Sequence, residues 1–206
     1  MISLDEILDT FDEAMKWTGT ASRQEIHRLG IWHQTFGCWV LHRSRLGDFL
    51  LLQRRHKLKE TQPNKLDISC AGHLSAGELP SDGIREMREE LGIEVNFEHL
   101  RQVGVYRYSD VGNGLRDNEF CHIFILEVED QPLVTYNPSR DEIRGLYLVS
   151  VSDLQSLCRQ AVGCIPLTGI EIDNYGRKLK NTLTVTMTDM VNSNVSYYEL
   201  LFSTIS

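Results

Sequence analysis

The alternation of hydrophobic and polar positions along the chain predicts a series of strands with a few helices between them. Runs rich in apolar, β-branched and aromatic residues indicate strands at 35–41, 49–53, 103–107, 120–128 and 145–149. Helical periodicity is clearest over 81–91, where Gly92 is a natural stop, and a second helix is expected over 152–160 with Ser152 as its cap. No internal repeat is visible, and no linker rich in proline, glycine or serine divides the chain into domains.

Two segments give weaker signals. At the N-terminus the apolar residues are spaced as on one face of a helix, so periodicity alone predicts a helix over 4–16. The tail over 182–206 is compatible with helix, but the pattern does not fix its boundaries. The aromatic pair Tyr197 and Tyr198 leaves three placements of this tail open: over a substrate cleft, on the sheet, or in a dimer interface.

Length and composition restrict the class of protein. A chain of 206 residues is expected to form one compact domain, and its 41% hydrophobic and 24% charged residues exclude wholesale disorder. The longest apolar runs, such as 49–52, are far too short to cross a bilayer. The formal net charge is −8 and no basic stripe is visible, which argues against nucleic-acid binding. A phosphate-bearing substrate would be repelled unless local cations or a bound divalent metal reversed this charge.

The N-terminus and the cysteines indicate the compartment. The first residues are acidic and lack a basic region followed by an apolar stretch, so no secretory signal is expected. The five cysteines are an odd number and contain no CxxC pair. We therefore expect reduced thiols in a cytoplasmic protein.

The most informative segment runs from residue 72 to residue 93. On a helix over 81–91, at about 100° per residue, one apolar stripe is formed by Ile84, Met87 and Leu91. Three carboxylates then gather on the broadly opposite side, namely Glu86, Glu89 and Glu90. Like charges this close repel each other, and two interpretations stay open. The face is either simply solvated, or it offers oxygen ligands to a hard cation such as Mg²⁺.

This segment resembles the Nudix box. The family pattern is Gly, five residues, Glu, seven residues, and then Arg-Glu, an apolar residue, any residue, Glu-Glu, any residue, Gly and an apolar residue. The matching residues are, in order, Gly72, Glu78, Arg85, Glu86, Met87, Glu89, Glu90, Gly92 and Ile93. Six residues, rather than seven, separate Glu78 from Arg85. This one-residue shortening lies where the loop meets the helix and leaves the glutamates unchanged.

The resemblance implies a fold and an activity. The implied fold is of the α/β (α+β) class, a Nudix-type α/β/α sandwich with a mixed central sheet. The implied activity is that of a MutT-like hydrolase, which cleaves a diphosphate linked to another moiety with Mg²⁺ or Mn²⁺. The metal would neutralise the diphosphate and activate the attacking water.

The resemblance also implies roles for single residues. Metal ligands are expected at Glu86, Glu89, Glu90 and Glu119, the last being alternatively a base or the polar end of a strand. The expected catalytic residues are Glu89, Glu86, Arg85 and Glu119, and Arg85 with Glu78 would organise the box loop. Substrate contacts are expected from Gly72 and His73 of the loop and from Arg54 and Arg55. The two arginines follow a strand, where guanidinium groups would bind phosphate or merely cap the strand edge.

A second layer of similarity leads to a subgroup related to isopentenyl diphosphate isomerase. Residues 23–33, 67–73 and 113–121 resemble its R-x-E-x-H…H element, its approach to the box and its N-G-x-x-E-N-E-x-C stretch. The subgroup also implies a β-hairpin, rather than a helix, over residues 4–19. We prefer the hairpin here, because periodicity is least reliable for short apolar runs.

The isomerases hold a metal with three histidines and two acidic residues. The counterparts in this sequence are His27, His33, His73, Asp117 and Glu119, while Cys70 corresponds to the isomerase's catalytic cysteine. Two departures are present: the first two histidines are one residue closer together, and Ala71 separates Cys70 from the Gly-His pair. The histidines are alternatively structural, and Cys70 is alternatively a small buried residue.

Because the isomerases lack the full Arg-Glu…Glu-Glu series, the sequence favours a hydrolase. We expect a single Nudix domain over 1–206, with a core of about 30–160, an N-terminal hairpin extension over 1–29 and a C-terminal extension over 161–206. The expected partner is a small-molecule diphosphate, with neither nucleic acid nor membrane, and a homodimer is open. Isomerisation of isopentenyl diphosphate and a non-catalytic module that binds a nucleotide or another diphosphate are the alternatives.

Overall fold

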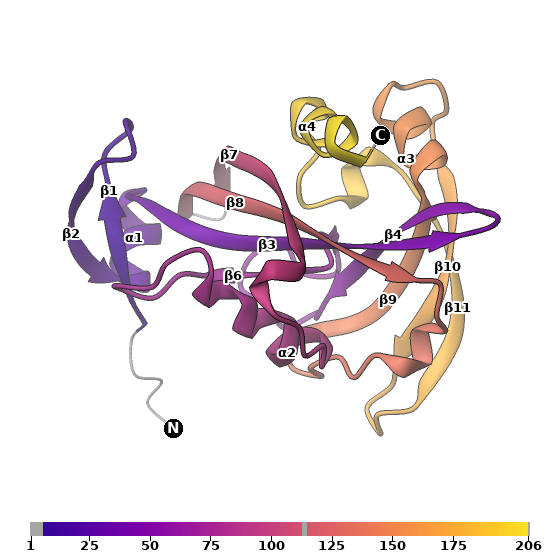
Figure 1. Cartoon of the computed structure of the whole chain (residues 1–206). Coiled ribbons are helices and arrows are strands. Elements are labelled where there is room, and N and C mark those ends of the chain that lie inside the picture. Colours follow the sequence, from indigo (N-terminus) through magenta and orange to yellow (C-terminus); the bar gives the residue numbers. More distant parts are fainter. Residues whose placement is uncertain (1–5, 113–114, 206) are drawn as a thin grey trace.

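A mixed sheet with helices on both faces forms the frame of the protein, seen in a computed structural model that describes residues 6–112 and 115–205 (Figure 1). Its strands are β1 (Ile7–Phe11), β2 (Trp17–Ser22), β3 (Trp32–Ser44), β4 (Gly47–Arg55), β5 (Leu66–Asp67), β6 (Cys70–His73), β7 (Leu100–Gly112), β8 (Leu115–Glu129), β9 (Ile143–Ser150), β10 (Ile165–Ile172) and β11 (Lys178–Val185). The α-helices are α1 (Arg23–Leu29), α2 (Arg85–Leu91), α3 (Val151–Cys158) and α4 (Val195–Ile205). Short 3₁₀ turns lie at Asp82–Ile84, Phe97–His99, Leu133–Thr135 and Met187–Asp189.

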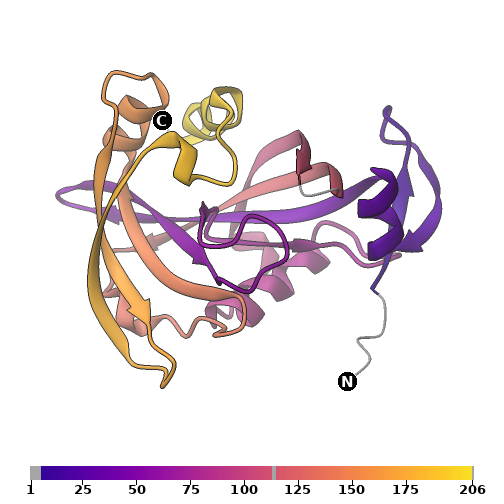
Figure 2. The same cartoon turned by 180° about the vertical axis from the view of Figure 1, so that it is seen from behind.

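The long strand β3 organises the sheet. The strand order is β11-β10-β9-β4-β3-β1-β2, with β5 on β4, β6 on β3, and the β7–β8 hairpin on the other side of β3. The β3–β8 pair is parallel and the other strand pairs are antiparallel, so the predicted mixed sheet is confirmed. The N-terminal hairpin and the β10–β11 hairpin lie at opposite ends of the sheet, as the view from behind shows (Figure 2).

Alternate side chains of β3 point into two hydrophobic cores. Trp39 and Leu41 pack into one core with residues of α3 and α4, whereas Phe36 and Val40 pack into the other with Met87 and Leu91 of α2. The helices α3 and α4 therefore cover one face of the sheet and α2 covers the other (Figure 1). This arrangement confirms the predicted α/β/α sandwich.

The N-terminus is a β-hairpin, so the helix that periodicity predicted over 4–16 is wrong. Strands β1 and β2 pair from Ile7↔Ser22 onward. In the turn between them the carboxylate of Asp12 accepts hydrogen bonds from the backbone N–H groups of Ala14 and Lys16, both 2.9 Å long, and Met15 has a φ of 62°. This side-chain-to-backbone bonding favours a turn over a continuous helix. Residues 4 and 5 of the predicted segment lie outside the described residues.

The other predicted elements are confirmed with changed ends. All five predicted strands exist, and each is longer than its hydrophobic run. The box helix is an α-helix from Arg85 and ends at Gly92, whose φ is 70°, as predicted. The cap of α3 is Ser150, whose Oγ accepts from the backbone N–H of Asp153 at 3.0 Å, and not Ser152. Residues 113 and 114, at the start of the stretch 113–121 that resembles the isomerase subgroup, lie outside the described residues.

Five helices and strands were absent from the prediction: α1, β5, β6, β10 and β11. The sequence contains two signals for helix α1, the N-cap residue Ser22 and Gly30, which adopts a left-handed conformation at its end. The helix has only seven residues, however, so its hydrophobic pattern is short. In the tail, 182–206, β11 ends at Val185 and α4 begins at Val195, packed on the face of the sheet. None of the helices among the described residues is long and apolar enough to cross a membrane.

Candidate active site

A cleft of about 750 Å³ lies where the start of β3, strand β6, helix α2 and the β7–β8 hairpin meet. The loop after β4 and both terminal extensions complete its walls. Eleven aspartate and glutamate side chains line it, but only three lysine or arginine side chains: Arg23, Arg55 and Lys59. The acidic excess that the composition showed is therefore concentrated in this cleft.

Arg85 holds the box loop against the box helix. Its guanidinium forms two parallel hydrogen bonds to the carboxylate of Glu78, at 3.0 and 3.1 Å, and donates a third to the carbonyl oxygen of His73 at 3.0 Å. This charge-assisted pair lowers the pKa of Glu78. The contact forms despite the shortened spacing, and the 3₁₀ turn Asp82–Ile84 occupies the shortened stretch. Arg85 is not among the residues that line the cleft, so we assign it a positioning role.

Arg85 also fixes two box glutamates. Its guanidinium contacts the carboxylate of Glu86, and it lies 3.3 Å from Glu89. The Glu86 carboxylate rests on the backbone of Gly72, where a Cβ atom would lie 2.3 Å from it. Glycine at position 72 is therefore a spatial requirement for this placement of Glu86.

Glu90 does not point outward with the other two, contrary to the prediction. Its side chain is buried, and its Oε2 accepts hydrogen bonds from Gln53 Nε2 and from the backbone N–H of Ala71, both at 3.1 Å. On a helix Glu90 lies about 60° from Met87, close to the apolar stripe rather than opposite it. Burial raises the pKa of Glu90 to about 8, since the charged form is poorly solvated there.

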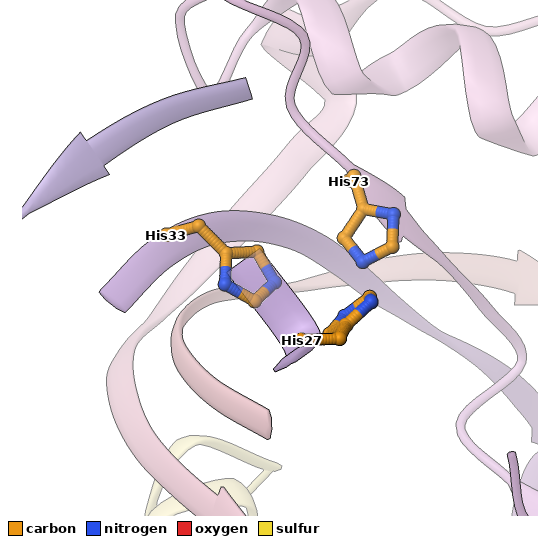
Figure 3. A group of neighbouring side chains, drawn as sticks. All are labelled: His27, His33 and His73. Atoms are coloured by element: carbon orange, nitrogen blue, oxygen red, sulfur yellow. The ribbon is translucent and has the colours of Figure 1, made fainter. Parts of the chain in front are cut away.

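Three histidines from three separate elements meet on the N-terminal side of the cleft (Figure 3). His27 of α1, His33 of β3 and His73 of β6 have ring centroids 5.2 to 5.4 Å apart, and their ligand nitrogens lie within 4.8 Å of one another. The start of β3 brings His33 beside β8, where it is paired with Glu119. The predicted grouping of these histidines is what the structure shows.

Two carboxylates complete this cluster. Asp117 Oδ1 lies 3.5 Å from His27 Nε2 and 3.7 Å from His33 Nε2, while Glu119 Oε1 lies 3.9 Å from His33 Nε2. His33 Nε2 and Asp117 Oδ1 are buried without a hydrogen-bond partner among the described residues. Buried polar atoms are normally satisfied, and ligand atoms around one divalent ion lie about 3 to 3.5 Å apart. The donor set therefore fits a divalent metal ion.

The other oxygen of Glu119 is held by the protein. Its Oε2 accepts from Thr35 Oγ1 at 3.3 Å and from Cys121 Sγ at 3.1 Å. Burial raises the pKa of Glu119 to about 8 and lowers that of His33 to about 4. Glu119 thus groups with His33 and Asp117 and not with the box glutamates, although Glu119 lines the same cleft as those glutamates.

The two arginines that were predicted to bind phosphate, Arg54 and Arg55, point to opposite faces of strand β4. Arg55 lines the cleft, where its guanidinium donates to Asp67 Oδ2 at 2.9 Å and to the carbonyl oxygen of Thr61 at 3.1 Å. Arg54 does not line the cleft, and its guanidinium pairs with Glu171 of β10. The place of Arg54 therefore removes it from the substrate-binding set, because neighbouring residues of a strand point in opposite directions.

Cys70 lies in the hydrophobic core on the α2 side of the sheet. It is fully buried beside Cys38, which pairs with it across β3 and β6, and it does not line the cleft. Burial raises the pKa of the Cys70 thiol well above its usual value. Cys70 is thus a small buried residue, as the alternative expected, and this placement speaks against a proton-transfer role.

Several lining residues escaped the sequence prediction. Lys59 contacts Glu142, Glu6 lies 3.4 Å from His73 Nδ1, and Tyr108 adds a phenol group. Lys59 belongs to the basic run after β4, which was the available signal. The others carry no motif, since only the packing of the extensions and of the β7–β8 hairpin brings them here.

Comparison with known proteins decides the family. The family model described as NUDIX domain matches residues 32–163. The chain belongs to the Nudix family. Helix α1, with its histidine, and helix α4 lie outside the matched residues of the Nudix domain.

Its relatives include both branches that the sequence indicated. The chain is 36% identical over 198 residues to a Nudix hydrolase of Clostridium acetobutylicum, covering 96% of this chain and 95% of that one. It is 32% identical over 158 residues to an isopentenyl-diphosphate Delta-isomerase of Saccharopolyspora erythraea, covering 70% and 77%. A Deinococcus radiodurans protein of known crystal structure shares the fold, with a TM-score of 0.57, 22% identity and coverage of 77% and 90%.

The histidine cluster of this Nudix protein predicts a specific metal-binding result. Added Co²⁺ should give one visible-absorbing complex per chain, because imidazole ligands suit first-row transition ions. His33→Asn should weaken this binding at least tenfold, since His33 contributes to both ligand groups. Exposed His99 provides the control His99→Asn. Unchanged Co²⁺ titrations in the His33 variant would show that the cluster is structural.

Proposed function

We propose that this protein is a divalent-metal-dependent hydrolase that cleaves a diphosphate linked to an organic group. The observation that supports the proposal is that Glu86, Glu89 and Glu90 of the box converge on one cleft, with Arg85 tying the first two in place. Glu119 lines the same cleft as part of the histidine cluster. Such a set of carboxylates is suited to Mg²⁺ or Mn²⁺, and Nudix enzymes generally use divalent metals. When bound, the metal would supply charge neutralisation of the diphosphate and activation of water.

The protein's own residues divide the remaining work. Arg85 holds Glu86, and Gln53 and the backbone N–H of Ala71 hold Glu90. Both carboxylates would therefore present their oxygens in fixed positions. Glu89 is half exposed at the cleft, where its carboxylate can accept a proton from an attacking water. Lys59 and Arg55 are cations of the same cleft and would contact phosphoryl oxygens once their carboxylate partners are displaced.

The charge of the cleft supports the proposed requirement for a metal. A diphosphate brings further negative charge into a space that already holds eleven carboxylates and only three lysine or arginine side chains. Repulsion in a partly buried site is strong, because the effective dielectric constant there is well below that of water. Divalent cations convert this repulsion into attraction. The net charge of −8 and an anionic substrate are then compatible.

The test is hydrolysis of a substrate panel. Nucleoside diphosphate derivatives and prenyl diphosphates are incubated with Mg²⁺ or Mn²⁺, and phosphate-containing products are separated. We expect turnover of at least one compound, abolition by EDTA, and a loss of at least 100-fold in kcat for Glu89→Gln. Glu98→Gln, on an exposed turn, is the control. The hydrolase proposal fails if no compound turns over, or if Glu89→Gln equals the parent.

Isomerisation of isopentenyl diphosphate is a second candidate, because the histidine and carboxylate cluster is assembled as the resemblance implied. The position of Cys70 speaks against it, since this thiol is buried in the core away from the cleft. We expect proton NMR to show no dimethylallyl diphosphate after incubation of the metal-loaded protein with isopentenyl diphosphate. Formation of that product, and its loss in Cys70→Ala, would instead establish the isomerase.

A further inference from the structure

Glu6 brings a carboxylate to the outer side of the histidine cluster. Its Oε2 lies 3.4 Å from Nδ1 of His73, and 36% of the Glu6 side chain and 18% of the His73 side chain are exposed. Glu6 directly precedes strand β1, so it lies outside the residues 32–163 that match the Nudix domain. It is also absent from the two groups of potential metal ligands among the described residues, which contain the histidines, Asp117 and Glu119. Glu6 therefore contacts the cluster from outside.

The backbone around Glu6 is held on both sides. Its carbonyl oxygen accepts from the backbone N–H of Arg23 at 2.7 Å, and the carbonyl oxygen of the next residue, Ile7, accepts from the backbone N–H of Ala76 at 2.8 Å. Arg23 is the first residue of α1, and Ala76 lies in the loop after β6. Glu6 is thus fixed between the helix and the strand that supply two of the three histidines.

The carboxylate of Glu6 lies closer to the imidazole than to its other ionic partner. Glu6 Oε2 is 3.9 Å from Arg23 Nε, and the same guanidinium lies 3.3 Å from Glu60. Both arginine contacts join side chains that are at least a third exposed, and ion pairs of this kind contribute little to stability. The contact of Glu6 that bears on the cleft is therefore the one with the ring of His73.

His73 is held at both its backbone and its ring. Its carbonyl oxygen accepts from Arg85 at 3.0 Å, whereas Nδ1 of its ring faces Glu6. The other ring nitrogen, Nε2, points toward His27 (Figure 3). An ionised carboxylate can only accept a hydrogen bond, so the nitrogen beside it carries the proton and Nε2 keeps its lone pair. A lone pair directed at the other histidines is what a metal ligand requires.

We propose that Glu6 is a positioning residue for the histidine cluster: it fixes the proton of His73 on Nδ1 and so directs Nε2 at a divalent transition-metal ion. In protein metal sites the ligating histidine almost always donates its other N–H to a carboxylate, a carbonyl oxygen or water, and this partner orients the ring and raises its basicity. The N-terminal segment thereby supplies the metal site with both a ligand, His27, and an orienting group. The proposal concerns metal binding and holds whether or not the protein is a hydrolase.

Nitrogen NMR of the imidazole rings tests the placement of the proton in the metal-free protein. Long-range ¹H–¹⁵N spectra of histidine-labelled protein at alkaline pH distinguish the two neutral tautomers, and His73→Gln identifies the signals of this ring by their loss. We expect His73 of the parent to carry its proton on Nδ1, and Glu6→Ala to shift the population toward the Nε2–H form. The control Glu13→Ala removes an exposed carboxylate from the turn of the same hairpin and should leave the spectrum unchanged.

Co²⁺ titrations give the second measurement. Glu6→Ala should weaken Co²⁺ binding by about 10- to 100-fold, the usual effect of removing the outer partner of a metal-bound histidine. Glu6→Gln keeps an oxygen that can accept from Nδ1 but carries no charge, so it should retain the parent tautomer and weaken Co²⁺ binding less than Glu6→Ala does. Thermal unfolding of the metal-free variants should match that of the parent, which separates a positioning role from a loss of structure.

Three results would overturn the proposal: an Nε2–H tautomer of His73 in the parent, a Co²⁺ affinity of Glu6→Ala equal to that of Glu13→Ala, or no Co²⁺ binding by the parent. The first is measured on the parent alone, so it remains decisive even if Glu6→Ala does not fold. Neither measurement uses a diphosphate, so failure of the hydrolase proposal and failure of this one are observed separately.

Discussion

Glu90→Gln should abolish most of the activity and, at pH 8, make the metal-free protein more stable. The variant keeps the shape of the side chain, and its amide oxygen can still accept from Gln53 and Ala71. A neutral amide is a poor substitute for a carboxylate ligand, so kcat/KM should fall at least 100-fold. Stability should rise because the variant no longer places an ionised carboxyl in a buried position.

The sign of the pH dependence follows from the raised pKa of Glu90. The folded protein holds this proton up to about pH 8, whereas the unfolded chain releases it near its ordinary value of 4.5. Stability linked to Glu90 is therefore full below pH 4.5 and is lost as the pH rises through 8, at up to about 1.4 kcal/mol per pH unit. Glu119 adds a dependence of the same sign, since its pKa is also raised to about 8.

Thermal unfolding in EDTA at pH 6 and pH 8 measures this effect. The unfolding midpoint temperature of the parent should be lower at pH 8 than at pH 6. The midpoint temperature of Glu90→Gln should decrease less, and at pH 8 it should exceed that of the parent by several degrees. The control is Glu94→Gln, because Glu94 is an exposed carboxylate that lies shortly after helix α2. This variant should match the parent in both activity and stability. A Glu90→Gln variant that is less stable than the parent at pH 8 would contradict the unfavourable burial of this carboxyl group, and a fully active variant would contradict its proposed role as a metal ligand.

Gly72→Ala should cost at least 100-fold in kcat/KM although it adds a single methyl group. The new Cβ would lie 2.3 Å from Cδ and Oε1 of Glu86, far inside contact distance. The backbone at this point is fixed by pairing with Phe36 on β3, so the carboxylate has to move. Because Arg85 contacts both Glu86 and Glu89, displacement of Glu86 would also disturb the contact between Arg85 and Glu89.

The Mg²⁺ concentration for half-maximal activity separates this effect from misfolding. It should rise at least tenfold in Gly72→Ala, while circular dichroism and the oligomeric state remain those of the parent. The matched control is Gly163→Ala, where the added Cβ meets no atom within 4 Å. Parent-like metal dependence in Gly72→Ala would mean that Glu86 is free to move and is not a positioned ligand.

The sequence by itself determined the family, the strands β3, β4, β7, β8 and β9 of the sheet, and the identity of the metal-binding candidates. This was possible because the Nudix box is local: its spacing places Glu78 and Arg85 together and puts the glutamates on one short helix, with Gly92 as the stop. The hydrophobic runs of the strands are local signals of the same kind.

The tertiary structure decided which of these residues work together. His27, His33 and His73 belong to a helix and two strands. Only the pairing of β3 with β6 and the packing of α1 against β8 place their nitrogens within 4.8 Å of one another. The same packing turned Glu90 inward, sent Arg54 to Glu171 and enclosed Cys70 in the core. Side-chain direction and burial depend on what each element packs against, and residues up to 158 positions apart, such as Trp39 and Tyr197, meet only after the chain has folded.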